Sequence, residues 1–370
     1  MAIPLLDLKA QYLSLKQEID QAIIKVLESG RFIFGPEMHA LEQEIAAYCG
    51  TDYAVAVGNG TDALVLALHA CGIKQGDEVI TSPFTFFASA ESIANVGATP
   101  VFVDIDPVTM NIDVNKIEAN LTSRTKAIIP VHIFGQMADM ESLMQLARVY
   151  GLKVIEDAAQ AIGAEYNGKK AGSYGDVGTF SFFPTKNLGA YGDGGMLVTG
   201  DEEIAEKTRM LRFHGCKTKY YHDEVGYNSR LDEIQAAILR VKFRYLDAWN
   251  EARREKAALY DKLLEPLAKQ GKLILPGRDP QAKHVYHLYV LRSADREKIA
   301  MELNAKGIAS GVYYPLPLHL QKAFAHLGYK PGDLPVAEKT CTEALAIPCY
   351  PELTAAQQEQ IAEVIHAALA

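Results

Sequence analysis

Short apolar runs alternate with amphipathic segments through the first 200 residues of the chain. The strand-like runs are residues 53–57, 78–82, 99–105, 126–133, 152–158, 177–183 and 194–200. Helical periodicities separate most of them, for example in the segment 139–149. This β-α-β rhythm predicts a mainly parallel seven-stranded sheet with helices on its faces, an α/β fold. In such sheets ligands gather at the carboxyl ends of the strands.

Helices are expected before and after this alternating region. A leading helix is expected within residues 1–30, and a second helix should begin at Pro36. A long helical stretch is expected from about Leu231 to Leu264, stopping before Pro266.

Beyond that stretch the pattern changes. A strand-like run at 287–292 and helices at 295–306 and 354–369 indicate a smaller C-terminal α+β domain. We therefore divide the chain into a large α/β domain, residues 1–250, and a small domain, residues 251–370.

Composition narrows the class of protein. The chain has 370 residues, 49% of them hydrophobic, and a net charge of -9, which is typical of a globular protein and disfavours nucleic acids and anionic membranes as partners. No apolar run reaches the roughly 20 residues of a membrane span, and no signal peptide is recognisable. The five cysteines lack metal-binding spacing. We predict a cytoplasmic protein without a bound metal.

A lysine stands among glycines in the segment SFFPTKNLGAYGDGG, residues 181–195. Partial burial would lower the pKa of the Lys186 amine and make it a nucleophile for a carbonyl group. A solvated lysine in a Gly-rich hairpin is the alternative reading.

Asp157 ends the apolar run in VIEDAAQAIG, residues 154–163. A buried carboxylate needs a partner, and a protonated pyridine nitrogen is one. The alternative is a helix N-cap aspartate. The neighbouring Glu156 should point to the opposite face of the strand.

Two further segments could contact a phosphorylated, flat ligand. In VGNGTDALVLAL, residues 57–68, a strand ends and a helix begins at Thr61, so free backbone N–H groups could hold a phosphate. An ordinary Asn-Gly turn is the alternative. In SPFTFFASA, residues 82–90, one of three phenylalanines (Phe84, Phe86 and Phe87) could stack on the ligand, and the others are expected in the core.

A phosphate turn, an aromatic platform, a strand-end aspartate and a Gly-flanked lysine thus fall on strand ends of one sheet. This is the layout of the fold-type I transferases that depend on pyridoxal 5′-phosphate (PLP). The motifs GTDAL, FVDID, IEDAAQ, SFFPTKNLGAYGDGG and NSRLDEIQAA moreover closely resemble those of the DegT/DnrJ/EryC1/StrS sugar aminotransferases. The resemblance runs from LLDLKAQY near the start to YYPLPLH near residue 319.

The resemblance implies a role for each matching residue. Lys186 would carry the cofactor and later move a proton, Asp157 would hold the pyridine nitrogen, and Gln160 would reach the phenolic oxygen. The further cofactor-binding residues implied are Gly60, Thr61, Asp62 and Ser181 for the phosphate, Phe86 for the ring, and Asn228 for the phosphate of the other subunit's cofactor. The last of these requires a homodimer.

The resemblance also implies a reaction in two halves. L-Glutamate would convert PLP to pyridoxamine 5′-phosphate and leave as 2-oxoglutarate, and the amine would then pass to a nucleotide-linked keto-sugar. Amination at C3 of a UDP sugar such as UDP-2-acetamido-2-deoxy-3-oxo-glucuronate is the closest likeness, with surface polysaccharides such as lipopolysaccharide O-antigen as the product pathway. C4 amination of a UDP or dTDP sugar, an amino-acid aminotransferase and a non-catalytic PLP-binding regulator are the alternatives.

Substrate contacts are less marked in the sequence. Arg230 could face a substrate carboxylate or form a structural salt bridge. The side chains of Tyr314, His319 and His132 could border the sugar or simply pack.

Overall fold

The computed structural model describes residues 2–370, and its centre is a seven-stranded sheet. The strand order is β1-β9-β8-β5-β4-β2-β3, in which β9 runs antiparallel to both of its neighbours and the other pairs are parallel. The strands are β1 (Tyr53–Val57), β2 (Glu78–Thr81), β3 (Thr99–Phe102), β4 (Thr125–Ile129), β5 (Lys153–Asp157), β8 (Val177–Ser181) and β9 (Gly195–Thr199). The predicted α/β fold with a mainly parallel sheet is confirmed.

Helices cover both faces of the sheet. One face packs on α2 (Pro36–Cys49), α5 (Met140–Tyr150) and α7 (Glu233–Phe243), and the other on α3 (Gly60–Ala70), α4 (Ala88–Asn95) and α6 (Glu202–Leu211). Because side chains alternate along a strand, Val154 of β5 joins the first core and Ile155 joins the second. The same alternation sends Glu156 toward the α2 side and Asp157 toward the α3 side.

The helical stretch predicted from Leu231 to Leu264 is two helices, and it does not stop before Pro266. Helix α7 ends at Phe243, and α8 (Leu246–Lys269) continues through Pro266 to Lys269. The proline cannot donate to the carbonyl four residues before it, and its ring crowds that carbonyl, so the turn needs other support. Leu264 and Leu267, which flank it, are buried in the small-domain core and hold the last turn in place.

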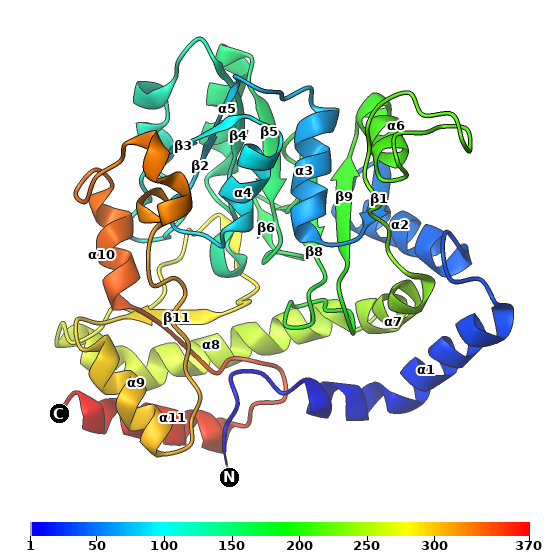
Figure 1. Ribbon diagram of the computed structural model, residues 1–370. Helices are drawn as coiled ribbons and strands as arrows, with labels where there is room; N and C mark the ends of the chain where they lie inside the picture. The colour runs from blue at the N-terminus through cyan, green and yellow to red at the C-terminus, as the bar shows by residue number, and fades with distance from the viewer. Residues whose placement is uncertain (1) are drawn as a thin grey trace.

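Helix α8 runs between the sheet and two C-terminal helices, α9 (Arg296–Ala305) and α11 (Ala355–Ala368). In Figure 1 the sheet with α3 and α4 lies above α8, and α9 and α11 lie below it. Leu246 near the start of α8 packs in the core of the sheet, whereas Tyr260 packs with the C-terminal part. A domain boundary at residue 250 would therefore fall inside one continuous helix, and it stays a prediction.

The remaining α-helices and strands lie at the start of the chain and after β5. They are α1 (Leu8–Ser29), β6 (Glu165–Tyr166), β7 (Lys169–Lys170), β10 (Ala282–Lys283), β11 (Tyr289–Arg292), α10 (Pro335–Glu343) and β12 (Ala344–Ile347). Strands β11 and β12 pair antiparallel. Among residues 2–370, no helix has the length and apolar character needed to cross a membrane.

Candidate active site

A cavity of about 880 Å³ opens where β5 and β8 end and α3 begins. This volume is in the range of a small-molecule or cofactor site. Nine of the residues named from the sequence line it, and these are Gly60, Thr61, Asp62, Phe86, Asp157, Gln160, Ser181, Lys186 and Tyr314. The strand ends and the helix start therefore bring together residues up to 254 positions apart, from Gly60 to Tyr314.

The N-terminus of α3 forms one wall of the cavity. The Asn59 side chain accepts a hydrogen bond from the Asp62 N–H at 2.8 Å and caps the helix. A Cβ atom on Gly60 would lie only 2.6 Å from Ser181 Cβ, so only glycine lets the helix start approach the end of β8 this closely. The remaining N–H groups of the first turn and the Ser181 hydroxyl suit a phosphate.

Asp157 stands at the end of β5, 6% exposed. Its carboxylate accepts hydrogen bonds from Ser89 Oγ at 2.7 Å and from the Ala159 N–H at 3.2 Å. No cationic side chain among residues 2–370 forms an ion pair with it. A buried carboxylate of this kind can hold a protonated ring nitrogen, which would supply the missing positive charge.

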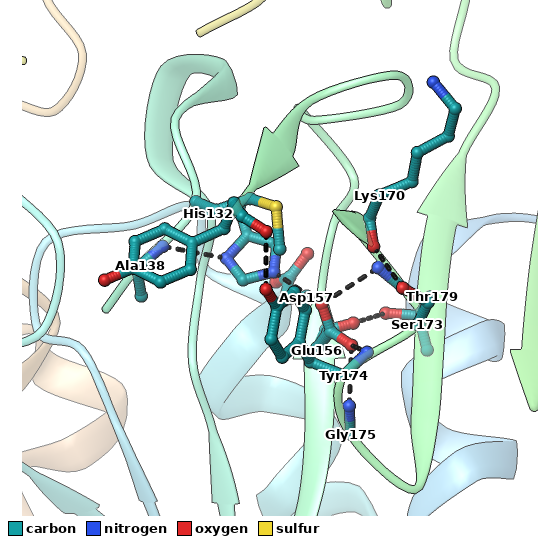
Figure 2. Close-up of polar contacts among 12 residues, drawn as sticks. His132, Ala138, Glu156, Asp157, Lys170, Ser173, Tyr174, Gly175 and Thr179 are labelled. Carbon is teal, nitrogen blue, oxygen red and sulfur yellow. Dashed lines mark hydrogen bonds and ion pairs between the residues drawn. The ribbon is translucent and has the colours of Figure 1, made fainter. Parts of the chain in front are cut away.

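Glu156, the preceding residue, points to the opposite side of the sheet, as the alternation predicts. It is fully buried and accepts hydrogen bonds from the backbone N–H groups of Gly172, Tyr174 and Gly175 at 2.8–2.9 Å. Figure 2 shows these contacts around the end of β5. Glu156 thereby fixes the turn that follows β7, and Asp157 remains free to face the cavity.

His132 belongs to this anchor and does not line the cavity, so its position matches the packing alternative. It is fully buried. Its Nδ1 accepts the Ala138 N–H at 3.2 Å, and its Nε2 lies 2.9 Å from Glu156 (Figure 2). Because Nδ1 accepts a hydrogen bond, the proton is on Nε2 and the ring is neutral.

Lys186 projects into the cavity from the loop between β8 and β9. Protein atoms surround the amine, and this burial lowers the pKa of Lys186 to about 8, although the charge of Asp157 opposes the shift. The loop is anchored to the segment before β11, because Asn187 Nδ2 donates a hydrogen bond to Val285 O at 3.1 Å. With this pKa about a tenth of the Lys186 amines is neutral at pH 7, and the neutral amine is the nucleophile.

Gln160 and Tyr314 meet at another wall. Gln160 Oε1 accepts the Phe134 N–H at 2.7 Å, and its Nε2 donates to the Tyr314 hydroxyl at 3.0 Å. Both side chains line the cavity. Burial raises the pKa of Tyr314 above that of a free tyrosine, so the hydroxyl keeps its proton and can donate in turn.

The three phenylalanines after β2 divide between cavity and core. Phe86 lines the cavity and is 59% exposed, which leaves one face of its ring free for a flat ligand. Phe84 is fully buried, and Phe87 packs against Phe324.

Three residues predicted from the sequence lie outside the lining. Asn228 is exposed, and Arg230 lies with its guanidinium 5.9 Å from the Phe213 ring centre. His319 is 1% exposed and lies 3.2 Å from Glu338. No acidic side chain among residues 2–370 pairs with Arg230, so it forms no salt bridge within the chain.

The structure adds lining residues that the sequence pattern did not single out. The main ones are Leu5, Leu6, Arg253, His287, Tyr313 and Cys349. Arg253 stands in the charge-rich run EARREK, where nothing distinguishes it from its exposed neighbours. Its position on the inner face of α8 becomes visible only in the fold.

Comparison with known proteins decides the family. The model of the DegT/DnrJ/EryC1/StrS aminotransferase family matches residues 13–366. The chain belongs to this family. The aminotransferase is also similar in structure to DesV from S. venezuelae in complex with a ketimine intermediate, with a TM-score of 0.96 and 44% identity over 99% of this chain and 98% of that one.

Two relatives span almost the full length of the aminotransferase. A "pleiotropic regulatory protein" of Geobacillus stearothermophilus is 56% identical over 99% of this chain and 98% of its own. The UDP-N-acetyl-3-dehydro-α-D-glucosamine 3-aminotransferase of Acidithiobacillus ferrooxidans is 49% identical over 100% of this chain and 98% of its own.

The aminotransferase depends on PLP, and its cavity fits that cofactor. The helix N-terminus with Ser181 suits the phosphate, Asp157 suits the ring nitrogen, and Lys186 offers an amine of lowered pKa. These features lie in one continuous cavity at the strand ends.

Proposed function

We propose that this aminotransferase moves the amino group of L-glutamate to C3 of a UDP-linked 3-oxo sugar, for the synthesis of a surface polysaccharide such as lipopolysaccharide O-antigen. The observation that carries the proposal is that Lys186 and Asp157 face one cavity, with a phosphate-binding helix start beside them. Amination at C4, or of a dTDP sugar, is the alternative.

Asp157 and Lys186 would have distinct chemical roles in this reaction. PLP supplies an electron sink that stabilises negative charge at the carbon losing its proton. Asp157 would keep the proton on the ring nitrogen. Lys186 Nζ would take up the proton from the α-carbon of glutamate and later release it, which requires a lysine that can become neutral near pH 7.

The other residues position the reacting groups. The N–H groups at the start of α3, with Thr61 and Ser181, would hold the cofactor phosphate. Gln160, fixed by the Phe134 N–H, would donate to the phenolic oxygen. Phe86 would stack on the ring and keep water from that face.

The sugar preference rests on the relatives and on Arg230. The Acidithiobacillus relative is named for amination of a UDP-linked 3-dehydro sugar. Arg230 has no acidic partner among residues 2–370, and a guanidinium in this state suits a diphosphate or a sugar carboxylate. Tyr314 and His319 remain further proposed contacts of the sugar.

A homodimer would complete the site. Asn228 and Arg230 lie outside the cavity of their own subunit but in the segment that we propose reaches the partner's cofactor. The preceding loop exposes Tyr220, Tyr221 and Val225 by 79%, 73% and 95%. A second copy of the chain would cover these apolar side chains.

The five cysteines form no disulfide, which supports a reducing compartment such as the cytoplasm.

A regulator without turnover is the second candidate, because the Geobacillus relative carries a regulatory name. A PLP-binding regulator could hold the cofactor with the same Lys186 and Asp157, so turnover with L-glutamate is what separates the two candidates.

The test is the visible absorption spectrum of the PLP-loaded protein before and after adding L-glutamate, with Lys186→Ala as the control. We expect the band of lysine-bound PLP in the wild type only, and its loss with glutamate. UDP- and dTDP-linked 3-oxo and 4-oxo sugars added next should restore it for the true acceptor. A stable band that ignores glutamate would contradict the proposal.

A further inference from the structure

A buried arginine lines the cavity on the side of α8. Arg253 is 3% exposed, and its Nη1 donates to the carbonyls of Cys349 at 2.6 Å, Tyr286 at 3.2 Å and His287 at 3.4 Å. Its Nε has no hydrogen-bond partner. No carboxylate among residues 2–370 forms an ion pair with it. A buried guanidinium held only by neutral carbonyls keeps an uncompensated positive charge.

The groups around Arg253 do not neutralise it. Burial and the nearby cations lower the pKa of His287 well below its usual value, so the ring is neutral. Burial raises the pKa of Cys349 to about 11, so the thiol is neutral too. The charge of Glu352 is felt at Arg253, but the two form no ion pair, and burial raises the pKa of Glu352.

His287 adds a second unpaired polar group to the same wall. It is 9% exposed, lines the cavity, and its Nδ1 has no partner among residues 2–370. Buried polar atoms without partners are rare, because each costs the free energy of its lost hydration. Both side chains line the cavity, so this wall of the site carries a buried positive charge beside unmet hydrogen-bonding capacity.

This wall lies next to the reactive lysine. Asn250, three residues before Arg253 on α8 and therefore on the same face of the helix, binds Asn187, the residue after Lys186. Lys186 is also close enough to lower the pKa of His287 by its charge. A ligand bound at Arg253 would thus sit beside the amine that moves the proton.

We propose that Arg253, with His287 beside it, binds a carboxylate of the amino donor. This inference rests on the proposed transamination from L-glutamate and adds where the donor is held. A planar carboxylate matches the guanidinium fork and compensates its charge. An amine without a carboxylate does neither.

The experiment measures binding of glutarate, a dicarboxylate that cannot react, to the PLP-loaded protein by isothermal titration calorimetry. The variants are Arg253→Met, Arg253→Lys and His287→Leu. The matched control is Arg254→Met, because Arg254 is the next residue of α8, pairs with Glu251 and does not line the cavity. The absorption band of bound PLP and the Tm are recorded for every variant.

We expect Arg253→Met to weaken glutarate binding about 10- to 100-fold, since a lost charge-assisted hydrogen bond corresponds to such factors. Arg253→Lys, which keeps the charge and loses the fork, should fall between Met and wild type. His287→Leu should weaken binding less, and Arg254→Met should not change it. The PLP band should persist in all of them.

Unchanged glutarate binding in both Arg253→Lys and His287→Leu would overturn the inference, and these two variants decide the matter if Arg253→Met does not fold. A lower Tm with unchanged glutarate binding would assign Arg253 a purely structural role. Either result can occur while the wild type still reacts with L-glutamate, so the proposed function would stand. A wild type that ignores L-glutamate would sink that function instead.

Discussion

Asn187 Nδ2 donates a 2.8 Å hydrogen bond to Asn250 Oδ1, and this bond ties the residue after Lys186 to helix α8. Asn250 also donates to Ile162 O at 3.0 Å, just beyond Gln160. One side chain of α8 therefore fastens both the lysine loop and the turn that follows Asp157. The loop is positioned by a distant helix rather than by its own glycines alone.

Replacing Asn250 with Ala should destabilise the protein. The change leaves Ile162 O and the Asn187 amide short of a buried partner, which costs about 1–3 kcal/mol of unfolding free energy. Urea denaturation monitored by circular dichroism measures it. Asn304→Ala, at an exposed position of α9, is the control and should stay within about 0.5 kcal/mol of wild type. Equal stabilities for the two variants would contradict the role given to Asn250.

Cofactor uptake should depend on pH through Lys186. The neutral amine is the nucleophile, and burial lowers the pKa of Lys186 to about 8, so the neutral form grows as pH rises through that value. The rate at which apoprotein gains the lysine-bound PLP band should rise between about pH 6 and 8 and level off above it. Stopped-flow absorbance checks this. A rate that keeps rising toward pH 10 would mean an ordinary, solvated lysine.

Asp157→Asn should keep the fold and lose most of the activity. The amide has the shape of the carboxylate and can still contact Ser89, but it cannot hold a proton on the ring nitrogen. We expect kcat for glutamate-dependent amination to fall at least about 100-fold, with Tm close to wild type. Steady-state kinetics and thermal unfolding measure the two quantities. A variant with near-normal kcat would remove Asp157 from the mechanism.

Glu156→Gln, in contrast to Asp157→Asn, should mainly lower the free energy of unfolding. One carboxylate oxygen accepts from Tyr174 and Gly175 and the other from Gly172, so the NH2 of glutamine must face N–H donors on one of the two sides. Each buried N–H that loses its acceptor costs about 1–3 kcal/mol. Chemical denaturation measures the loss, and the exposed Glu359→Gln on α11 is its control. A small loss would show that water or a rearranged turn replaces these contacts.

Much of the fold follows from local pattern in the sequence. The seven apolar runs became the seven strands, because buried strands of a parallel sheet need continuous apolar side chains. The break between α7 and α8 had no such signal, since Arg244 and Tyr245 fit a helix as well as its neighbours do.

Some residues of the candidate site could likewise be predicted from the sequence, and others could not. Residues at strand ends and helix starts, such as Asp157 and Thr61, could be found because their neighbours in the sequence place them. Arg253 and His287 could not, since the path of α8 brings Arg253 to the cavity and the segment before β11 brings His287 there. His132 shows a related ambiguity, because a histidine near a strand end can equally bind a carboxylate on the far face of the sheet.

The two carboxylates at the end of β5 also restrict where this protein can tolerate insertions and deletions. Side chains alternate strictly along a strand, so inserting or deleting one residue within β5 would exchange the places of Glu156 and Asp157. The cavity would then receive the side chain meant for the turn at Tyr174, and the turn would lose its acceptor. Insertions and deletions should therefore be tolerated in the surface loops of this protein and rejected within β5.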